Sequence, residues 1–413
     1  MSKSSYSGPA SAVIWLLFLS LVPFAAAITA PLLADERVLF FESRKFIALD
    51  PLAPFQLPLG GSGTWRPLLS YVYWLDSGAP APLSHAINLG LHAVLVWLSW
   101  RWMLRLLPPR GALLGAAFFA CHGAHVASAG WVAGRADLLM ALCVVAALLA
   151  QKRGQLGLCM LASGLAVLCK ETGVVVVPIL FLMAWRTDRE RPHRWRPPLV
   201  ASMSTLPLFA VSVLRSEVAS SYWPAVSSLQ AGLSVLPAFA VELFVPLFRP
   251  LGLGHGWRDL AGLLLALPAL ALFVVVGGSV KERSLWVLGL ALAGLSLLPV
   301  IHVLPNDGGQ WYLLLPSLGA ALSWGLVLSE QRLPGRLVLG FLAVLALYSA
   351  WETSCWVQAS VRVDEMIHQA RSLREETGEV MQLPPQDPRE WPHMGPSLCC
   401  GIPFQVLEEL PSR

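Results

Sequence analysis

Two adjacent carboxylates, Asp35 and Glu36, follow the first long apolar run of the chain by only a few residues. A carboxylate held just above a membrane surface can accept a proton from an acceptor hydroxyl or amine. Burial or a nearby like charge tunes the pKa of such a group, and adjacent acids favour this tuning. The pair therefore predicts a general base, with a solvated pair at a helix end as the alternative.

Three later motifs each place one cation at the outer boundary of an apolar run. They are Thr64–Leu69 with Arg66, Trp131–Asp137 with Arg135, and Cys169–Thr172 with Lys170. An isolated charge at that boundary is costly unless it is paired or functional. The three side chains together predict a phosphate site, with arginine as a planar fork and lysine as a point charge. The alternatives are contacts with lipid headgroups and ion pairs inside each motif. Those pairs would be Arg135–Asp137 and Lys170–Glu171.

Five polar side chains stand out inside apolar runs. His85, Asn88 and His92 have the spacing of one helix face. The two histidines are separated by roughly 10 Å of helix rise, which is too far for both to bind one metal ion. Hydrogen bonds to neighbouring helices are therefore predicted. His122 and His125 precede the Arg135 motif, and we expect them either to line an acceptor cleft or to pack in the interior.

Neither a metal nor a cofactor is predicted. The seven cysteines form no metal-binding pattern, and those in apolar stretches are expected to be small buried hydrophobic residues. No Walker loop, dinucleotide fingerprint or nucleophile elbow is present in the sequence. Gln310 and Trp311 precede Tyr312 in a segment that is typical of an interfacial aromatic anchor.

The composition excludes a soluble globular protein. Of the 413 residues, 56% are apolar and 13% are charged, with a mean hydropathy of +0.62, whereas about 25% of residues are charged in an ordinary soluble domain. A soluble chain of this length would lack the polar surface to cover its cores. The net charge of +4 is spread along the chain, so no nucleic-acid surface is predicted. The expected class is an all-α polytopic membrane protein.

The chain contains twelve apolar runs of the length that a membrane crossing requires, about 20 residues. They centre near residues 20, 95, 119, 144, 163, 178, 206, 240, 269, 293, 319 and 343. Lys and Arg gather at alternate ends, as expected for cytoplasmic loops. This alternation holds throughout only if residues 230–248, which contain Pro237, Glu242 and Pro246, do not cross. We therefore expect about eleven transmembrane helices and one re-entrant or interfacial helix.

The same topology divides the chain. Residues 1–352 form the transmembrane domain, with a long first outer loop at residues 31–83. Residues 11–30 are expected to be the first transmembrane helix rather than a cleaved signal peptide. The tail, residues 353–413, changes in composition and is predicted to form a short extracytoplasmic helix and cap.

Taken in order, these motifs resemble those of the GT-C superfamily of polytopic glycosyltransferases. The resemblance is greatest to transmembrane O-mannosyltransferase-like proteins, many of which carry tetratricopeptide repeats. It covers roughly residues 10–350 and is carried by six motifs. These are Asp35-Glu36, TWRPL from Thr64, His85-x-x-Asn88-x-x-x-His92, His122-x-x-His125 with GRADLL from Gly134, LCKE from Leu168 and YLLLPSLG from Tyr312.

The resemblance implies transfer of a sugar from a polyprenyl-phosphate carrier to a protein, glycan or lipid acceptor outside the cytoplasm, with inversion at the anomeric carbon. It places the general base at Asp35, with Glu36 second, and the donor phosphate near Arg135 and Lys170, beside which the residues themselves suggest Arg66. The acceptor or its cleft would be lined by His122, His125, Asp137, Glu171 and Tyr312. Related proteins are metal-independent, and the lipid-linked sugar is a substrate rather than a cofactor.

The sequence departs from the family pattern in three places. Gln310-Trp311 replaces a Glu-Arg pair, Glu42-Ser43 stands where a second acid and an asparagine are usual, and no tetratricopeptide array is visible after the last apolar run. A non-catalytic lipid-binding, transport or assembly protein on the same scaffold is therefore the alternative function. The composition predicts a bacterial inner membrane with the site facing the periplasm, and the endoplasmic reticulum is the alternative location.

Overall fold

The computed structural model describes residues 9–59, 63–187, 192–216, 226–247, 268, 270–301, 310–329 and 333–377. Within these ranges the regular elements are helices, and the β-structure is one isolated bridge between Leu59 and Thr64. The all-α prediction is confirmed for this part of the chain.

The first half of the chain forms α1 (Pro9–Leu21), η1 (Val22–Thr29), α2 (Ala34–Leu49), α3 (Ala53–Gln56), α4 (Pro67–Asp76), α5 (Ala81–Met103), α6 (Pro109–Ala120), η2 (Gly123–His125), α7 (Val126–Ala129), η3 (Val132–Gly134), α8 (Arg135–Arg153), α9 (Leu156–Cys169) and η4 (Glu171–Val175). The second half forms α10 (Val176–Arg186), α11 (Arg196–Arg215), α12 (Val226–Phe244), α14 (Arg283–Leu297), η7 (Leu298–Val300), η8 (Gln310–Leu313), α16 (Leu314–Ser329) and α17 (Gly335–Thr377).

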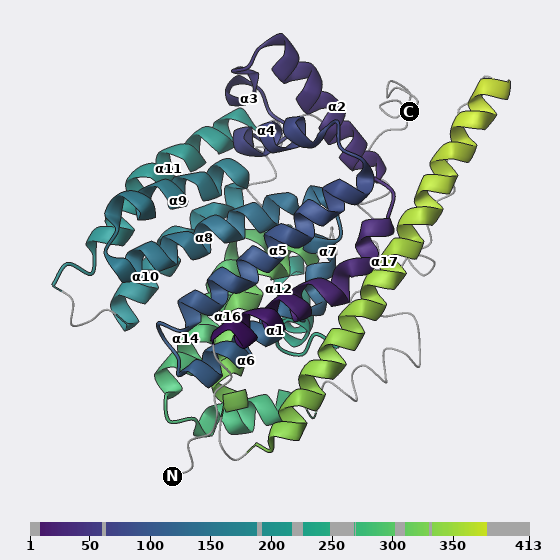
Figure 1. Cartoon of the computed structure of the whole chain (residues 1–413). Helices are drawn as coiled ribbons and strands as arrows, with labels where there is room; N and C mark the ends of the chain where they lie inside the picture. The colour runs from purple at the N-terminus through teal and green to yellow at the C-terminus, as the bar shows by residue number, and fades with distance from the viewer. Residues whose placement is uncertain are drawn as a thin grey trace.

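Helix α8 illustrates why these segments begin and end where they do. Asp137 lies in its first turn, while Lys152 and Arg153 lie in its last turn. Each charge is stabilised by the helix dipole at its own end. The helix stops at Gly154, whose φ of 70° is left-handed, a conformation that glycine adopts at helix C-termini without a Cβ clash. Helix α9 then returns antiparallel along α8 (Figure 1).

Six described helices are long and apolar enough to cross a membrane, and a seventh crossing results if the bent pair α6 and η2–α7 forms one span. The six are Ala10–Thr29, Ala81–Met103, Val132–Arg153, Arg196–Arg215, Arg283–Val300 and Gly335–Glu365. Helices also occupy other predicted runs, but α9, α10 and α16 have only 14, 11 and 16 residues, fewer than the roughly 20 that a crossing needs. The chain is a multi-pass membrane protein, and the expected count of eleven spans stays a prediction.

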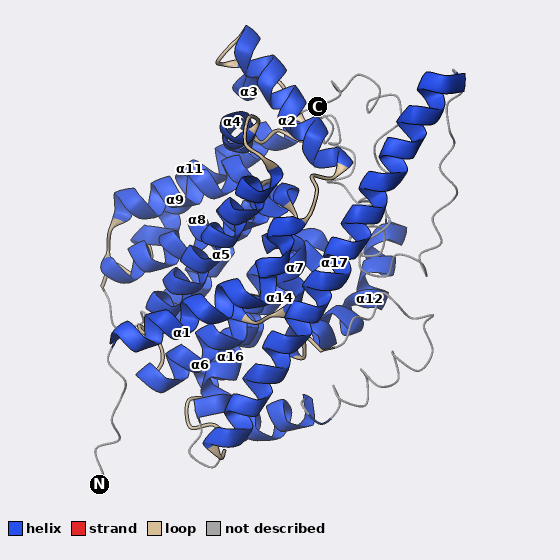
Figure 2. Ribbon diagram, turned by 45° about the vertical axis from the view of Figure 1, so that its right-hand side comes forward, coloured by secondary structure: helices blue, strands red, loops and turns tan. Residues whose placement is uncertain are grey.

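The centre of the bundle is α16, whose residues from Leu314 to Leu328 are all buried. It packs between α6 and α14 (Figure 2). Its neighbours approach closely at glycines, since a Cβ added to Gly115 would lie 2.6 Å from the Ala321 carbonyl oxygen, and one added to Gly289 would lie 2.6 Å from the Gly319 carbonyl oxygen. Small residues of this kind allow helix backbones to come together in membrane proteins.

The predicted outer loop is helical. Helices α2, α3 and α4 lie together at one end of the bundle, the top in Figure 1. The long helix α17 runs obliquely along the side of the bundle toward the same end, where the carboxylate of Asp364 pairs with Arg37 of α2 at 2.5 Å. The expected boundary between residues 352 and 353 lies inside α17 rather than between two elements. The cap expected beyond Thr377 lies outside the described residues.

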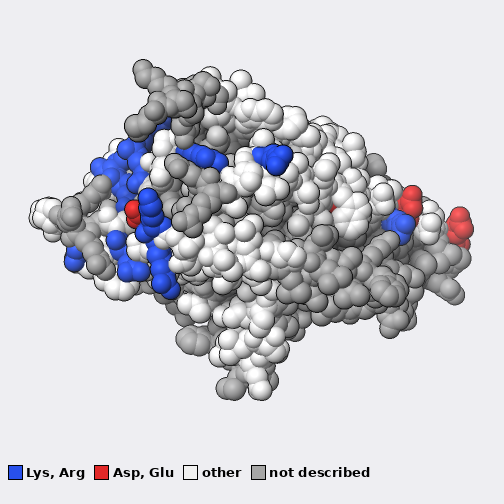
Figure 3. Space-filling view, turned by 90° about the horizontal axis from the view of Figure 1, so that it is seen from below, with Lys and Arg blue, Asp and Glu red and all other residues white. Residues whose placement is uncertain are grey.

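The opposite end carries many of the cations. Seen from below, Lys and Arg side chains gather on one part of the surface, with few Asp or Glu among the described residues there (Figure 3). Near the ends of α5, α10 and α11, Arg101, Arg186 and Arg194 lie over tryptophan rings, with distances of 5.9, 5.2 and 5.0 Å from the guanidinium carbon to the ring centroid. Aromatic rings and cations at helix ends are typical of a membrane interface.

Candidate functional site

Arg66 lies where the chain enters α4, as the residue before Pro67. Its guanidinium donates two parallel hydrogen bonds to the Glu171 carboxylate in η4, from Nε to Oε2 at 2.9 Å and from Nη2 to Oε1 at 2.7 Å. The two side chains are 16% and 9% exposed. A bidentate arginine–carboxylate pair fixes both planes and is stronger than a neutral hydrogen bond.

Lys170 forms a second pair. Its Nζ lies 2.6 Å from Oδ1 and 2.8 Å from Oδ2 of Asp137, and both side chains are 5% exposed. Asp137 belongs to the first turn of α8, where the helix dipole favours a negative charge. The ammonium also lies 4.8 Å from the ring centroid of Tyr312, within the range of a cation–π contact.

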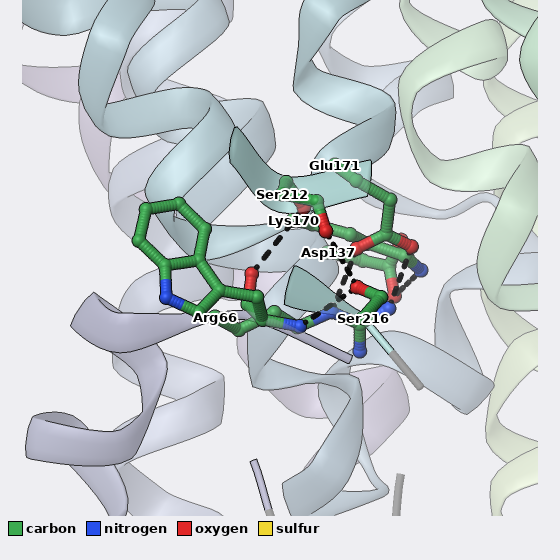
Figure 4. Close-up of polar contacts among 7 residues, drawn as sticks. Arg66, Asp137, Lys170, Glu171, Ser212 and Ser216 are labelled. Carbon is green, nitrogen blue, oxygen red and sulfur yellow. Dashed lines mark hydrogen bonds and ion pairs between the residues drawn. The ribbon is translucent and has the colours of Figure 1, made fainter. Parts of the chain in front are cut away.

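Together these four ionisable side chains form one buried group, shown in Figure 4, which we call the charge cluster: Arg66, Asp137, Lys170 and Glu171. Its formal charges cancel. The alternative of pairing inside each motif is wrong, because every pair joins two motifs that are distant in the sequence. Residues one or two positions apart in a helical turn do not face each other. Lys170 and Arg135 therefore reach carboxylates on other elements more readily than Glu171 and Asp137 of their own motifs.

The electrostatics of the cluster are most direct at Glu171, which lies between α9 and α10. Burial alone raises the pKa of this carboxyl. The Arg66 guanidinium, and to a smaller extent Lys170, outweigh burial and hold the pKa of Glu171 below its ordinary value of 4.5. Glu171 is therefore a carboxylate at neutral pH, and it keeps the guanidinium oriented.

Helix α11 fixes the position of the Arg66 segment. The backbone N–H of Trp65 donates to the Ser216 hydroxyl at 3.1 Å, and the Ser212 hydroxyl donates to the Trp65 carbonyl at 3.5 Å (Figure 4). The Trp65 indole N–H donates to the Phe55 carbonyl at 3.1 Å. Neither serine is predictable from the sequence, because a serine near the end of an apolar helix carries no signal of its partner.

Arg135 has its own partners at the start of α8, where it is 1% exposed. Its Nη1 donates to the Asp76 carboxylate at 2.7 Å, its Nε to the Asn88 side-chain oxygen at 2.7 Å and its Nη2 to the Ser84 carbonyl at 2.9 Å. These contacts join α4, α5 and α8. These contacts hold Arg135 inside the protein, and its predicted contact with the donor phosphate stays a prediction.

The acidic pair lies at the start of α2. Glu36 is 1% exposed, and its carboxylate accepts the N–H of Leu33 at 2.6 Å and the N–H of Val132 at 2.5 Å. It therefore fastens the first turn of α2 to the segment that leads into α8. The backbone of Asp35 lies in the same turn, but its side chain is outside the described residues, so its role as a base stays a prediction.

The predicted interhelical hydrogen bonds of the α5 histidine face are confirmed. The Nδ1 of His85 lies 2.7 Å from the Gly130 carbonyl oxygen, Asn88 donates to the Trp131 carbonyl at 2.8 Å, and the Nε2 of His92 lies 3.1 Å from the Nδ1 of His125. His122 and His125 are both fully buried. The packing alternative is thus favoured over a cleft lining, because rings with no exposed surface cannot contact a bound acceptor.

Two further expectations bear on the site. Among the described residues, no three His, Cys, Asp or Glu side chains are grouped closely enough to hold a metal ion. The side chains of Gln310 and Trp311 lie outside the described residues, so the effect of these two residues on activity stays a prediction.

No family model matches the chain. Two curated proteins of Drosophila melanogaster are similar to it. The protein O-mannosyl-transferase Tmtc1 is 36% identical over 129 residues, which are 29% of this chain and 15% of that protein. The protein O-mannosyl-transferase Tmtc2 is 31% identical over 156 residues, 32% of this chain and 17% of that protein. The resemblance predicted from the motifs is confirmed. The match spans less than a fifth of either relative.

Solved structures also show similarity at low sequence identity. ArnT from Cupriavidus metallidurans, solved bound to undecaprenyl phosphate, has 17% identity and a TM-score of 0.47, covering 90% of this chain and 73% of that chain. The oligosaccharyltransferase of Archaeoglobus fulgidus, solved with zinc and sulfate, has 14% identity and a TM-score of 0.42, covering 91% of this chain and 57% of that chain.

Proposed function

We propose that the chain is an inverting glycosyltransferase that moves a sugar from a polyprenyl-phosphate carrier to an acceptor on the extracytoplasmic side of the membrane. The observation that supports this most is the buried charge cluster, which holds a guanidinium and an ammonium beside the segment to which α2 is fastened. The names of the two curated relatives support the same reaction class, and mannose is the first sugar to test.

The cluster suits a phosphate because its cations are held in place before the ligand arrives. Asp137 and Glu171 orient Lys170 and Arg66, and oriented cations stabilise charge that develops on a leaving group. The ammonium has three N–H donors, so Lys170 can contact a phosphate oxygen while it keeps one bond to Asp137. Arg66 can likewise share its guanidinium between Glu171 and the phosphate.

In the proposed reaction the acceptor oxygen or nitrogen attacks the anomeric carbon from the face opposite the phosphate. The bond between the anomeric carbon and the phosphate oxygen breaks, and the electron pair leaves with the polyprenyl phosphate. The acceptor proton passes to the Asp35 carboxylate. One displacement of this kind inverts the anomeric carbon and uses no metal.

The distribution of charge supports the proposed side of the membrane. Helices α2–α4 lie at the end of the bundle opposite the face on which Lys and Arg gather (Figures 1 and 3). Because cytoplasmic loops carry an excess of these residues, we assign the site to the extracytoplasmic side. The bacterial inner membrane, with the site facing the periplasm, is the setting that we propose from composition.

A non-catalytic role is the second candidate, as a lipid-binding, transport or assembly protein. One observation favours it. In each of the two ion pairs of the cluster the carboxylate balances the charge of the cation, as it would in a purely structural core. The two functions differ in one measurable respect, since an enzyme releases the sugar from its carrier and a binding protein does not.

The test is an assay of the purified protein with a panel of labelled polyprenyl-phosphate sugars and peptide, glycan and lipid acceptors. We expect transfer with inversion, and a loss of at least about a hundredfold in Asp35→Asn, within the range that general-base catalysis contributes. Glu42→Gln on the same helix is the matched control and keeps full activity. Undiminished turnover in Asp35→Asn refutes the assigned base, and donor binding without sugar release favours the non-catalytic role.

A further inference from the structure

Four polar contacts follow one another through the buried centre of the bundle. The Nδ1 of His92 lies 3.1 Å from the Ser20 carbonyl oxygen, and its Nε2 lies 3.1 Å from the Nδ1 of His125. The Nε2 of His125 lies 2.8 Å from the Ser317 Oγ, which lies 2.7 Å from the Leu314 carbonyl oxygen. These contacts join α1, α5, η2 and α16. We call the series the His92–His125–Ser317 chain, and all three of its side chains are fully buried.

The His92–His125–Ser317 chain has fewer N–H and O–H hydrogen atoms than hydrogen-bond contacts. Both ends are carbonyl oxygens, which only accept, so each of the four contacts needs one hydrogen. A neutral imidazole carries one N–H and a serine carries one O–H. Two neutral histidines and Ser317 therefore supply three hydrogens for four contacts. The fourth contact is completed only when one more proton is present.

The two protonation states differ by one proton and by the positions of the other hydrogens, while the heavy atoms stay in place. In the neutral state His92 donates from Nδ1 to Ser20, His125 donates from Nδ1 to His92, and the Ser317 hydroxyl donates to Nε2 of His125. With one more proton, His125 donates from Nε2 to Ser317, whose hydroxyl turns to the Leu314 carbonyl. The added charge is then shared across the 3.1 Å contact between the two rings.

Neighbouring His122 shows that this mismatch is particular to the chain. Its Nε2 lies 3.0 Å from the Leu243 carbonyl oxygen, and its Nδ1 accepts the Ala124 N–H at 3.3 Å. One acceptor and one donor satisfy a neutral imidazole completely. His122 stacks on His125 with ring centroids 5.1 Å apart, so it is a titratable group in direct contact with the His92–His125–Ser317 chain.

The aromatic groups packed against the His92–His125–Ser317 chain carry no charge. The elements that pack on η2 and α16 also include α17 and α12, which contain the buried carboxyl groups of Glu352 and Glu242. The rings of Phe24 and Phe119 contact His92 and His125, with ring centroids 5.1 and 4.6 Å apart respectively. The helices α1, η1, α7 and α16 contain no Asp, Glu, Lys or Arg. The cations of α5 and α6, Arg101 and Arg110, lie near the ends of these helices, away from the chain. In the described residues, no carboxylate hydrogen bonds to His92, His125 or Ser317. Because burial in such surroundings favours the uncharged form, the neutral state is expected at neutral pH.

We propose that the His92–His125–Ser317 chain is a buried binding site for a single proton, which is taken up at acid pH without movement of the heavy atoms. The inference rests on the contact geometry and the donor count, and it holds whether or not the protein transfers sugar. Through Ser317, uptake of the proton changes the hydrogen bonding of α16, the helix that directly follows η8 and its Tyr312.

Nitrogen NMR of the full chain with ¹⁵N-labelled histidine, reconstituted in lipid nanodiscs and titrated with acid, tests the proposal. At neutral pH we expect His92 and His125 both to be neutral and protonated at Nδ1. On acidification their signals should change together at one midpoint, with one proton taken up between them, while His122 keeps its neutral spectrum over that range. Separate midpoints, two protons, or no change before the protein unfolds overturn the proposal.

Three variants at serine positions of α16 complete the test. Ser317→Ala removes the partner that accepts from the protonated chain, so proton affinity should fall about tenfold, which is one pH unit. Ser317→Thr keeps the hydroxyl and should restore the wild-type midpoint, which separates the effect from a general loss of packing. Ser323→Ala is the matched control, since its hydroxyl donates to the Trp286 carbonyl at 3.0 Å. A wild-type titration in Ser317→Ala contradicts the proposal.

Discussion

Two arginines of this chain hold carboxylates in different ways. Arg135 is 1% exposed and uses three nitrogens on three partners from two other helices. Arg66 is 16% exposed and makes one bidentate pair. A buried charge that loses its partner is far more costly than one near solvent, so the two positions should respond differently to the same substitution.

We expect Arg135→Lys to destabilise the fold more than Arg66→Lys. A lysine at position 135 leaves two of the three contacts unmade, which at about 1.5 kcal/mol each amounts to about 3 kcal/mol. Arg66→Lys loses one of the two contacts with Glu171, so its expected loss of stability is about half as large. Chemical unfolding of the two purified variants in the same detergent measures the difference. Equal losses of stability contradict this expected difference between the two arginines.

The lowered pKa of Glu171 predicts how the cluster responds to pH. A carboxyl whose pKa is lower in the folded protein stabilises the fold fully above its ordinary pKa of 4.5, and this contribution disappears as the pH falls through the lowered folded value. The wild type should therefore lose thermal stability in this acid range, whereas Glu171→Gln should show a flatter profile. Parallel profiles for the two proteins rule out the Arg66–Glu171 contribution.

At the scale of elements, α2 is held by contacts with two other parts of the bundle, the segment before α8 and the helix α17. Glu36 ties its first turn to Val132, and Arg37 ties it to Asp364 of α17. The two backbone N–H groups that Glu36 accepts are donors that a buried helix start must satisfy. The position of Asp35 therefore depends on Glu36, which acts as a positioning residue in the proposed reaction.

Glu36→Gln should loosen this attachment while the bundle stays folded. A glutamine has one acceptor oxygen where the carboxylate has two, so the N–H of Leu33 or of Val132 loses its partner. We expect hydrogen exchange of the peptides that contain these residues to rise at least tenfold, together with a lower rate of sugar transfer. The control Glu42→Gln, farther along α2, should change neither. Unaltered exchange in Glu36→Gln indicates that α2 is held by its packing alone.

At the scale of the whole molecule, the sequence predicted the membrane class, the helical segments and the gathering of Arg66 and Lys170 in one cluster. Apolar composition and cation spacing contain that information directly. Arg135, predicted to join these two cations, binds Asp76 instead. The alternative of pairs inside each motif is wrong, because Asp137 and Glu171 lie 33 and 105 residues from the cations that they hold. Only the packing of α4, α8 and η4 brings these residues together. The count of eleven spans stays a prediction, because apolar runs do not show where a helix ends, and Ser317 gave no sign of its contact with His125.

If the charge cluster binds the donor phosphate, a variant that removes one of its ion pairs should bind the donor more weakly. Lys170→Met alone leaves Asp137 buried without its cation, which costs about 3–5 kcal/mol. Lys170→Met combined with Asp137→Asn removes both charges and should recover most of that stability.

The measurement is the affinity of purified wild type and paired variant for a labelled polyprenyl-phosphate mannose. We predict that the paired variant, although stably folded, binds the donor at least tenfold more weakly, because one charge-assisted contact to the phosphate is worth about 1.5–3 kcal/mol. Wild-type affinity in a stable paired variant contradicts phosphate binding by the cluster, since the Lys170–Asp137 pair would then serve the fold alone.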